Sequence, residues 1–135
     1  GYEKFPKKQI LKLIKISLAL KKKYKIKNSC VLGHSDIAPL RKIDPGEKFP
    51  WVKLSAHNLG KWYKEHKGKN EINLKQIEAS FFKNLQKLGY RYFSIHKRNI
   101  KDKRIVKSFQ QHYLPNNVTG KIDQKTYKIS HFLTN

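Results

Sequence analysis

The stretch from Gly33 to Trp51 sets the strongest limit on how this chain can fold. It reads GHSDIAPLRKIDPGEKFPW and holds three prolines and two glycines. Proline lacks the backbone N–H that a helix interior or a central strand needs, so neither element can run through the stretch. We therefore expect a polar, proline-stiffened loop, with regular elements only on either side of it.

Two elements are predicted before this loop. Apolar residues recur at helical spacing after Pro6, and lysines occupy much of the opposite face. This pattern predicts a helix over residues 6–24, with proline suited to its first turn. Residues 26–32 contain the apolar run Cys30-Val31-Leu32, with Asn28 before it and Gly33 after it, and this pattern predicts a short strand.

A short helix and a linker are predicted after the loop. Residues 51–58 favour the helix, and Gly60 can end it. Residues 64–71 are charged, contain a glycine and lack apolar side chains, which is typical of a linker. We place this linker at residues 64–72.

The last 63 residues favour three helices. Asn73 can cap the first, which Gly89 ends; the second spans residues 102–113; Asp123 can cap the third. The apolar positions at helical spacing are Ile77, Phe81, Leu85, Leu88, Ile105, Val106, Phe109, Tyr127, Ile129 and Phe132. The chain thus predicts an α/β unit over residues 1–63 and a small three-helix module over residues 73–135.

The charge of the chain limits its partners only broadly. The formal net charge is +22 over 135 residues, and four of the 31 basic residues are Arg. Such a charge attracts nucleic acid, anionic lipid or an acidic wall polymer. Dedicated readers of bases and phosphates favour Arg, so we favour a general lysine-rich composition over a nucleic-acid surface.

Other sequence features exclude some classes of protein. No apolar run nears the roughly 20 residues of a membrane span. Cys30 is the sole cysteine, which excludes an internal disulfide and CxxC zinc sites, and we expect it to pack in a core. No signal peptide is visible and the first residue is not Met, which we interpret as the mark of a processed product or a fragment.

The loop contains side chains that can carry chemistry. His34 and Asp44 are ligands that zinc accepts, but a catalytic zinc needs three protein ligands and one open position. The sequence leaves the direction of Asp36 open. Lys42 could stabilise a developing oxyanion beside a metal. The alternative is structural: His34 follows a strand, Lys42 is solvated, and Asp44 begins an Asp-Pro-Gly turn.

The order of residues in this loop resembles a family signature. The string His34-Ser35-Asp36-Ile37-Ala38-Pro39-x-Arg41-Lys42-x-Asp44-Pro45-Gly46-x-x-Phe49-Pro50-Trp51 is similar to that of the zinc-dependent N-acetylmuramoyl-L-alanine amidases, in the AmpD/AmiD branch of the type 2 amidase family. The resemblance covers residues 1 to about 63, and its motif has many fixed positions.

The resemblance implies a reaction and roles for four residues. The family hydrolyses the amide between N-acetylmuramic acid and L-alanine of the stem peptide, and some members prefer the 1,6-anhydro sugar. By position, His34 and Asp44 would be zinc ligands, Lys42 the oxyanion-stabilising lysine, and Arg41 a weaker match for a substrate-binding residue. Phe49 and Trp51 would anchor the loop by packing.

The chain departs from this pattern at its N-terminal side. The family's first zinc histidine and its catalytic glutamate precede the motif, whereas this chain has no histidine before His34 and Glu3 as its sole acid there. The later histidines are expected to be surface or packing residues: His57, His66, His96, His112 and His131. We therefore expect residues 1–63 to be the C-terminal part of an amidase domain, with a separate N-terminal amidase segment completing the zinc site.

The final segment is similar to the small peptidoglycan-binding-like module that follows some of these catalytic domains. The resemblance rests on Val106, Phe109 and Gln110, and on Gly120, Ile122, Asp123 and Thr126. A wall-binding role and a purely structural appendage are both open.

Two functions remain in competition. The first is a peptidoglycan amidase with muropeptide substrates, which implies the bacterial periplasm or cell envelope, with the cytoplasm as the alternative compartment. The second is a non-catalytic, basic binder of peptidoglycan or other polyanions, nucleic acid included. A degenerate, inactive product is a third interpretation.

Overall fold

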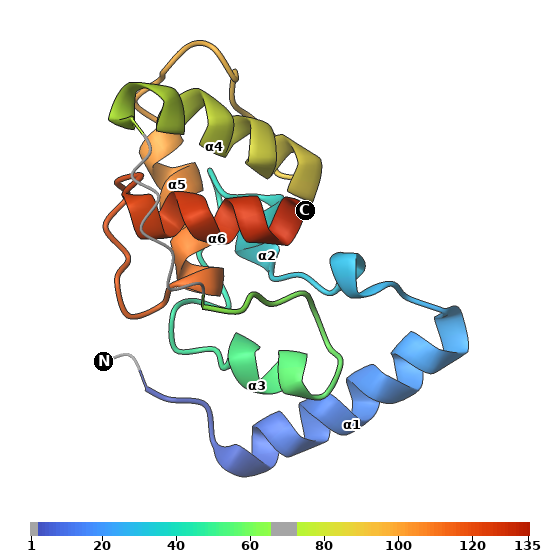
Figure 1. Ribbon diagram of the computed structural model, residues 1–135. Coiled ribbons are helices and arrows are strands. Elements are labelled where there is room, and N and C mark those ends of the chain that lie inside the picture. Colours follow the sequence, from blue (N-terminus) through green and yellow to red (C-terminus); the bar gives the residue numbers. More distant parts are fainter. Residues whose placement is uncertain (1–2, 66–72) are drawn as a thin grey trace.

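The computed structural model describes residues 3–65 and 73–135. Within those ranges every regular element is a helix (Figure 1). The elements are α1 (Lys7–Tyr24), the 3₁₀-helix η1 (Asn28–Cys30), α2 (His34–Ile37), α3 (Trp51–Ala56), α4 (Leu74–Leu88), α5 (Asp102–Tyr113) and α6 (Gln124–Thr134).

The predicted α/β class is wrong for this chain, because residues 3–65 and 73–135 contain no strand. The predicted strand at residues 26–32 holds η1, and the flanking Lys27 and Val31 are extended without forming a strand. A strand exists only when its backbone pairs with a neighbouring strand. No described segment pairs with this run, so its apolar pattern has no sheet to join.

The first helix matches its prediction closely. Helix α1 spans Lys7–Tyr24 and buries Ile10 and Ile14. Lys25 ends it in the left-handed conformation, with φ of 52°. The predicted helix at residues 51–58 is also present as α3, although it ends at Ala56.

The three predicted C-terminal helices are present with the predicted caps. The Asn73 side chain accepts a hydrogen bond from Lys75 N, and the Asp123 side chain accepts one from Thr126 N. Gly89 ends α4 with φ of 106°, a conformation that favours glycine. Helices α4, α5 and α6 enclose a core that includes Phe81, Leu85, Ile105, Phe109 and Ile129.

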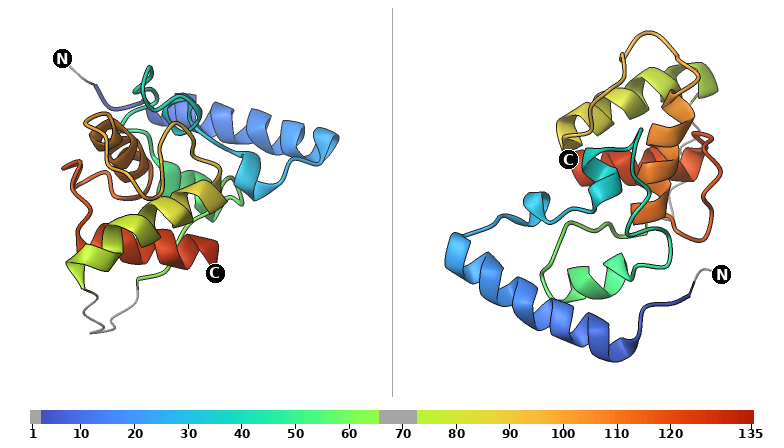
Figure 2. Two further views of the ribbon diagram at one scale, coloured as in Figure 1. Left: turned by 90° about the horizontal axis from the view of Figure 1, so that it is seen from above. Right: turned by 180° about the vertical axis from the view of Figure 1, so that it is seen from behind.

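The helices form two groups with the 33–51 loop between them. Helix α1 lies along one side with α3 against it, and α4, α5 and α6 gather on the other side (Figures 1 and 2). Ile10, Ile14, Trp51, Leu54 and Leu59 form a second, smaller core. Trp62 packs against both cores.

The predicted linker at residues 64–72 falls largely on residues 66–72, which lie outside the described residues. The division into residues 1–63 and 73–135 therefore stays a prediction. Cys30 is exposed rather than packed in a core. In the described part of the chain, none of the helices combines the length and apolar character of a membrane span.

Candidate functional site: the His34–Asp44 loop

The loop begins at a glycine that a larger residue could not replace without movement. A Cβ atom on Gly33 would lie 2.7 Å from Pro45 Cδ and 3.2 Å from Trp51 Cζ2. The chain then forms α2, a single turn of helix that the sequence did not predict. The Ser35 backbone N–H donates to Asp44 O at 2.9 Å, so the two ends of the loop are joined next to both predicted zinc ligands.

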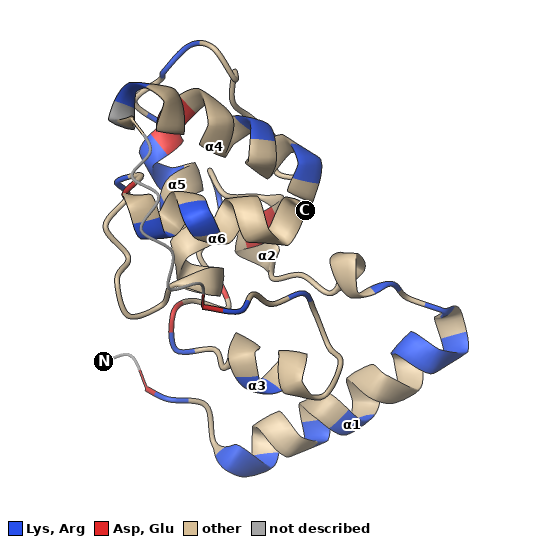
Figure 3. Ribbon diagram, viewed as in Figure 1, with Lys and Arg blue, Asp and Glu red and all other residues tan. Residues whose placement is uncertain are grey.

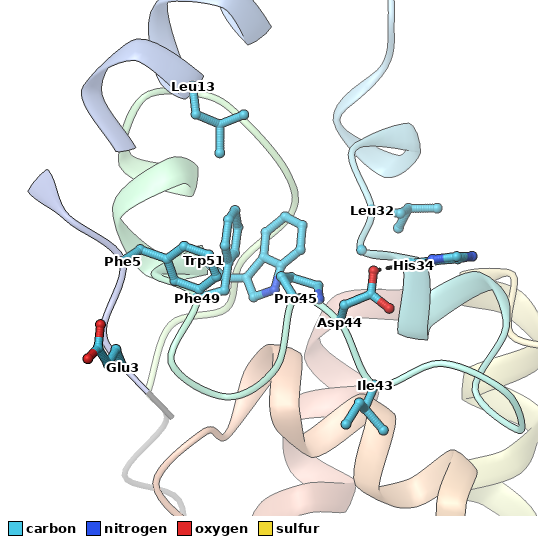
Figure 4. A pocket seen from close by; sticks show the side chains of 11 residues that line it. Glu3, Phe5, Leu13, Leu32, His34, Ile43, Asp44, Pro45, Phe49 and Trp51 are labelled. Carbon is cyan, nitrogen blue, oxygen red and sulfur yellow. Dashed lines mark hydrogen bonds and ion pairs between the residues drawn. The ribbon is translucent and has the colours of Figure 1, made fainter. Parts of the chain in front are cut away.

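The fold brings the two predicted ligands together. His34 Nδ1 lies 3.2 Å from Asp44 Oδ2, and their side chains are 49% and 63% exposed (Figure 4). Two donor atoms on one tetrahedral zinc lie about 3.3 Å apart, because each sits about 2.0–2.1 Å from the metal. The donor types and their separation therefore fit one zinc ion with an open outer side.

The described residues supply two such donors here and no more. Across residues 3–65 and 73–135, no three His, Cys, Asp or Glu side chains gather in a way that could hold a metal. His57, His96 and His131 are exposed, and none of them approaches His34 within hydrogen-bonding distance. His66 lies outside the described residues.

The two predicted cationic site residues lie on the turn between the ligands. The Arg41 and Lys42 backbone N–H groups both donate to Ala38 O, at 3.0 and 2.9 Å. Their side chains are exposed. The backbone thus places Lys42 at the end of a tight turn, two residues before Asp44. The roles of the Arg41 and Lys42 side chains stay predictions.

An apolar pocket opens beside the ligand pair (Figure 4). Its volume is about 550 Å³, and His34 and Asp44 lie on its wall. The rest of the wall comes from Glu3, Phe5, Leu13, Leu32, Gly33, Ile43, Pro45, Phe49 and Trp51. The Phe5 and Phe49 rings meet edge to face at 5.5 Å, and Trp51 continues this contact at 4.7 Å. Trp51 is buried, as its predicted packing role requires.

Asp36 has partners other than the predicted ligand pair. Its carboxylate accepts hydrogen bonds from Gly33 N at 2.8 Å, from the Tyr90 hydroxyl, and from His112 Nδ1 at 2.7 Å. Asp36 is 5% exposed and His112 is 3% exposed. Asp36 is thus a structural carboxylate, held by these three donors rather than gathered with the two predicted zinc ligands.

His112 is a packing residue, as predicted, but it also has a partner that the sequence did not reveal. Its ring lies between Trp51 and Tyr113, with centroid distances of 4.0 and 3.9 Å and nearly parallel planes. The pairing with Asp36 spans 76 positions, so no local sequence pattern could predict it. Its one sequence signal is a histidine on the apolar face of a predicted helix.

The buried acid also affects two tyrosines. Burial, followed by the charge of Asp36, raises the pKa of Tyr90 well above its ordinary value. The same two causes, in the same order, raise the pKa of Tyr113. Both hydroxyls therefore stay protonated at neutral pH, and Tyr90 can act as the donor to Asp36.

Gln110 joins the last two helices, α5 and α6, through a network of hydrogen bonds. It is fully buried, and its Oε1 accepts hydrogen bonds from Thr119 N and Gly120 N at 2.9 and 2.8 Å. Its Nε2 donates to Lys121 O and to Thr126 Oγ1. One side chain thus connects α5, the following turn and α6.

Comparisons with known proteins agree with the loop signature. No protein-family model matches the chain. The chain is 29% identical over 141 residues to the N-acetylmuramoyl-L-alanine amidase AmiD of Escherichia coli strain K12, covering 96% of this chain and 48% of that protein. The chain therefore spans about half the length of this curated relative.

Two solved amidase structures have similar folds. One is the complex of Escherichia coli AmiD with the substrate anhydro-N-acetylmuramic acid-L-Ala-D-γ-Glu-L-Lys. It matches with a TM-score of 0.84 and 28% identity over 98% of this chain and 53% of the other. The other is AmpDh3 from Pseudomonas aeruginosa, also solved with an anhydromuramic pentapeptide. Its TM-score is 0.83 at 24% identity, over 98% of this chain and 54% of the other. In sequence and in fold, this chain is similar to about half of an N-acetylmuramoyl-L-alanine amidase.

Proposed function

We propose that this chain forms part of a peptidoglycan amidase that hydrolyses the amide between N-acetylmuramic acid and L-alanine. The observation that carries the proposal is the 3.2 Å approach of His34 Nδ1 to Asp44 Oδ2 at the wall of an open pocket. The similarity to AmiD over 96% of the chain supports the same reaction class. The anhydro sugar in the AmiD complex makes the 1,6-anhydro muropeptide the first substrate to test.

His34 and Asp44 would hold zinc in this proposal, with a third ligand supplied by an N-terminal amidase segment. A bound zinc polarises the amide carbonyl and lowers the pKa of a water molecule at its open position. Half-exposed donors suit this arrangement, because the third ligand and the substrate must reach them from the open side.

Lys42 and Arg41 would act on the substrate. An ammonium group stabilises the negative charge that develops on the amide oxygen, and Lys42 ends the turn that lies two residues before Asp44. Arg41 is suited to a substrate carboxylate, because its guanidinium can form two parallel hydrogen bonds. The muropeptide is the expected partner, and the substrate implies the periplasm or cell envelope of a bacterium.

The metal part of the proposal is tested by calorimetric titration of the chain with Zn²⁺. Two ligands should give one-to-one binding that is much weaker than a three-ligand site, and His34→Ala should abolish it. His57→Ala and His66→Ala are the controls, and neither should change the affinity. Submicromolar binding by the chain alone that persists in both controls would contradict the missing third ligand.

The catalytic part is tested with the chain joined to the segment that completes the site. Lys42→Ala should lower kcat about 100-fold or more with a small change in KM, because the lysine acts on charge that develops in the transition state. Release of the L-alanyl peptide from an anhydro-muropeptide is the measurement. An unchanged kcat would remove Lys42 from the mechanism.

A further inference from the structure

The carboxylate of Asp36 connects the ligand loop to the helices that follow it in sequence. One of its three donors, Gly33 N, belongs to the loop itself. The other two, Tyr90 Oη and His112 Nδ1, come from just beyond the end of α4 and from the last turn of α5. A carboxylate can only accept, so each of these hydrogen bonds has the acid as its acceptor, and charge-assisted bonds of this kind are strong.

The same loop segment carries both proposed zinc ligands. His34 and Asp36 belong to the single turn of α2, and Ser35 N donates to Asp44 O from that turn. A displacement of Asp36 would therefore move the backbone that positions His34 and release the backbone contact beside Asp44. The position of the ligand pair thus depends on what holds Asp36.

We propose that Tyr90 and His112 are positioning residues for the zinc loop. By binding the Asp36 carboxylate, they fix the turn that sets the separation of His34 and Asp44. The zinc in this statement rests on the proposed function, whereas the positioning of the loop does not. In this view the 73–135 module forms part of the ligand site, in addition to any role in binding the cell wall.

Two further contacts extend this support along the loop. Arg104 Nη1 donates to Leu40 O at 2.9 Å, which holds the turn before Lys42 against α5. Trp51, at the end of the loop, stacks on the His112 ring. Helix α5 thus contacts the beginning, middle and end of the loop. His112 takes part in two of these contacts, since one nitrogen binds Asp36 while its ring supports Trp51.

Hydrogen exchange distinguishes positioning from general packing. Tyr90→Phe removes one donor to Asp36 and keeps the ring. The Gly33 and Ser35 amides should then exchange about tenfold faster, while core amides of α4 and α6 keep their rates, because one lost charge-assisted bond loosens only the loop. Tyr63→Phe is the matched control, because its hydroxyl donates to Tyr113 O at 2.8 Å without contacting Asp36.

A conservative replacement of the histidine gives a rescue test. His112→Leu removes the donor, whereas His112→Asn keeps an N–H near the position of Nδ1. The asparagine variant should restore protection of the Gly33 and Ser35 amides relative to the leucine variant. Equal exchange in both variants would overturn the proposal. So would uniform acceleration of all amides in Tyr90→Phe, or loop acceleration of the same size in Tyr63→Phe.

A zinc titration followed by NMR links the loop to the ligand pair. With Zn²⁺ alone as the probe, the His34 ring signals should shift in the unsubstituted chain and in Tyr63→Phe at the same concentration. Tyr90→Phe should need about three to ten times more zinc for the same shift, because His34 and Asp44 are held less firmly in position. If zinc does not shift the His34 ring signals of the unsubstituted chain, the metal site of the proposed function is refuted. The amide exchange rates still test the positioning role in that case. If His34 responds equally in all three proteins, positioning is refuted and the metal site stands.

Discussion

At the residue scale, the site depends on close contacts that individual side chains allow. Gly33 can approach Pro45 and Trp51 because it has no Cβ, and Asp36 is buried because three donors surround it. Neither role follows from the type of residue alone. A glycine after an apolar run indicates a turn, and an aspartate near a histidine suggests a ligand. In this chain the glycine permits packing and the aspartate is structural.

Gly33→Ala should therefore disturb the ligand loop. The added Cβ would lie 2.7 Å from Pro45 Cδ, so the loop must shift, at a cost of about 1–3 kcal/mol in the free energy of unfolding. NMR should show changed His34 ring signals and weaker binding of Zn²⁺.

Gly120→Ala is the matched control for this substitution. Its Cβ would meet the flexible Lys103 and Lys107 side chains, and its φ of 75° strains any other residue. The control should thus lose about 1 kcal/mol of stability through its backbone without changing the His34 signals. Equal changes at His34 in both variants would show that the loop responds to stability in general.

At the scale of the elements, caps and apolar spacing decide where the helices lie. Asn73 and Asp123 cap α4 and α6 as the sequence predicts, and α5 has its predicted bounds. The turn between α5 and α6 is held instead by a buried side chain, Gln110, which bonds to both sides of that turn. Local sequence signals determine where the helices begin and end. The turn that connects α5 to α6 is fixed by the tertiary contacts of Gln110.

Gln110→Leu should destabilise the C-terminal module. The leucine keeps most of the volume but leaves the Thr119 and Gly120 N–H groups without their acceptor, which costs about 2–4 kcal/mol in the free energy of unfolding. Urea unfolding followed by circular dichroism measures the loss. Gln111→Leu, at the partly exposed neighbouring position, should change stability by about 0.5 kcal/mol or less. A similar loss in both variants would show that the hydrogen bonds of Gln110 contribute little.

At the scale of the whole molecule, the charge is spread over most elements. Figure 3 shows Lys and Arg along α1 and on α4, α5 and α6, rather than on one helix or one edge. The formal net charge of +22 still makes association with any polyanion favourable at low salt. Such an association needs no particular site.

DNA titrations at increasing salt separate the two proposed functions. An amidase with this charge should bind DNA only weakly and non-specifically, with an affinity that falls about 10³-fold or more between 50 and 200 mM salt. His34→Ala should not change this binding, which makes it the internal control. Submicromolar DNA binding that persists at about 0.15 M salt would favour the basic binder.

The sequence determined most of the helices and the nature of the loop. Helical spacing, prolines and capping residues act over a few positions, so their effect can be read locally for α1, α4, α5 and α6. The candidate site was indicated by the resemblance of the whole string from His34 to Trp51 to an amidase signature, rather than by its separate residues. The predicted strand at residues 26–32 failed because an apolar run becomes a strand only beside a partner.

The tertiary structure alone decided how the site is held. It placed His34 Nδ1 next to Asp44 Oδ2 and joined Asp36 to Tyr90 and His112. These partners lie 54 and 76 positions from Asp36. A contact over that separation depends on how α2 and α5 pack, and packing results from the whole set of buried side chains rather than from any local pattern.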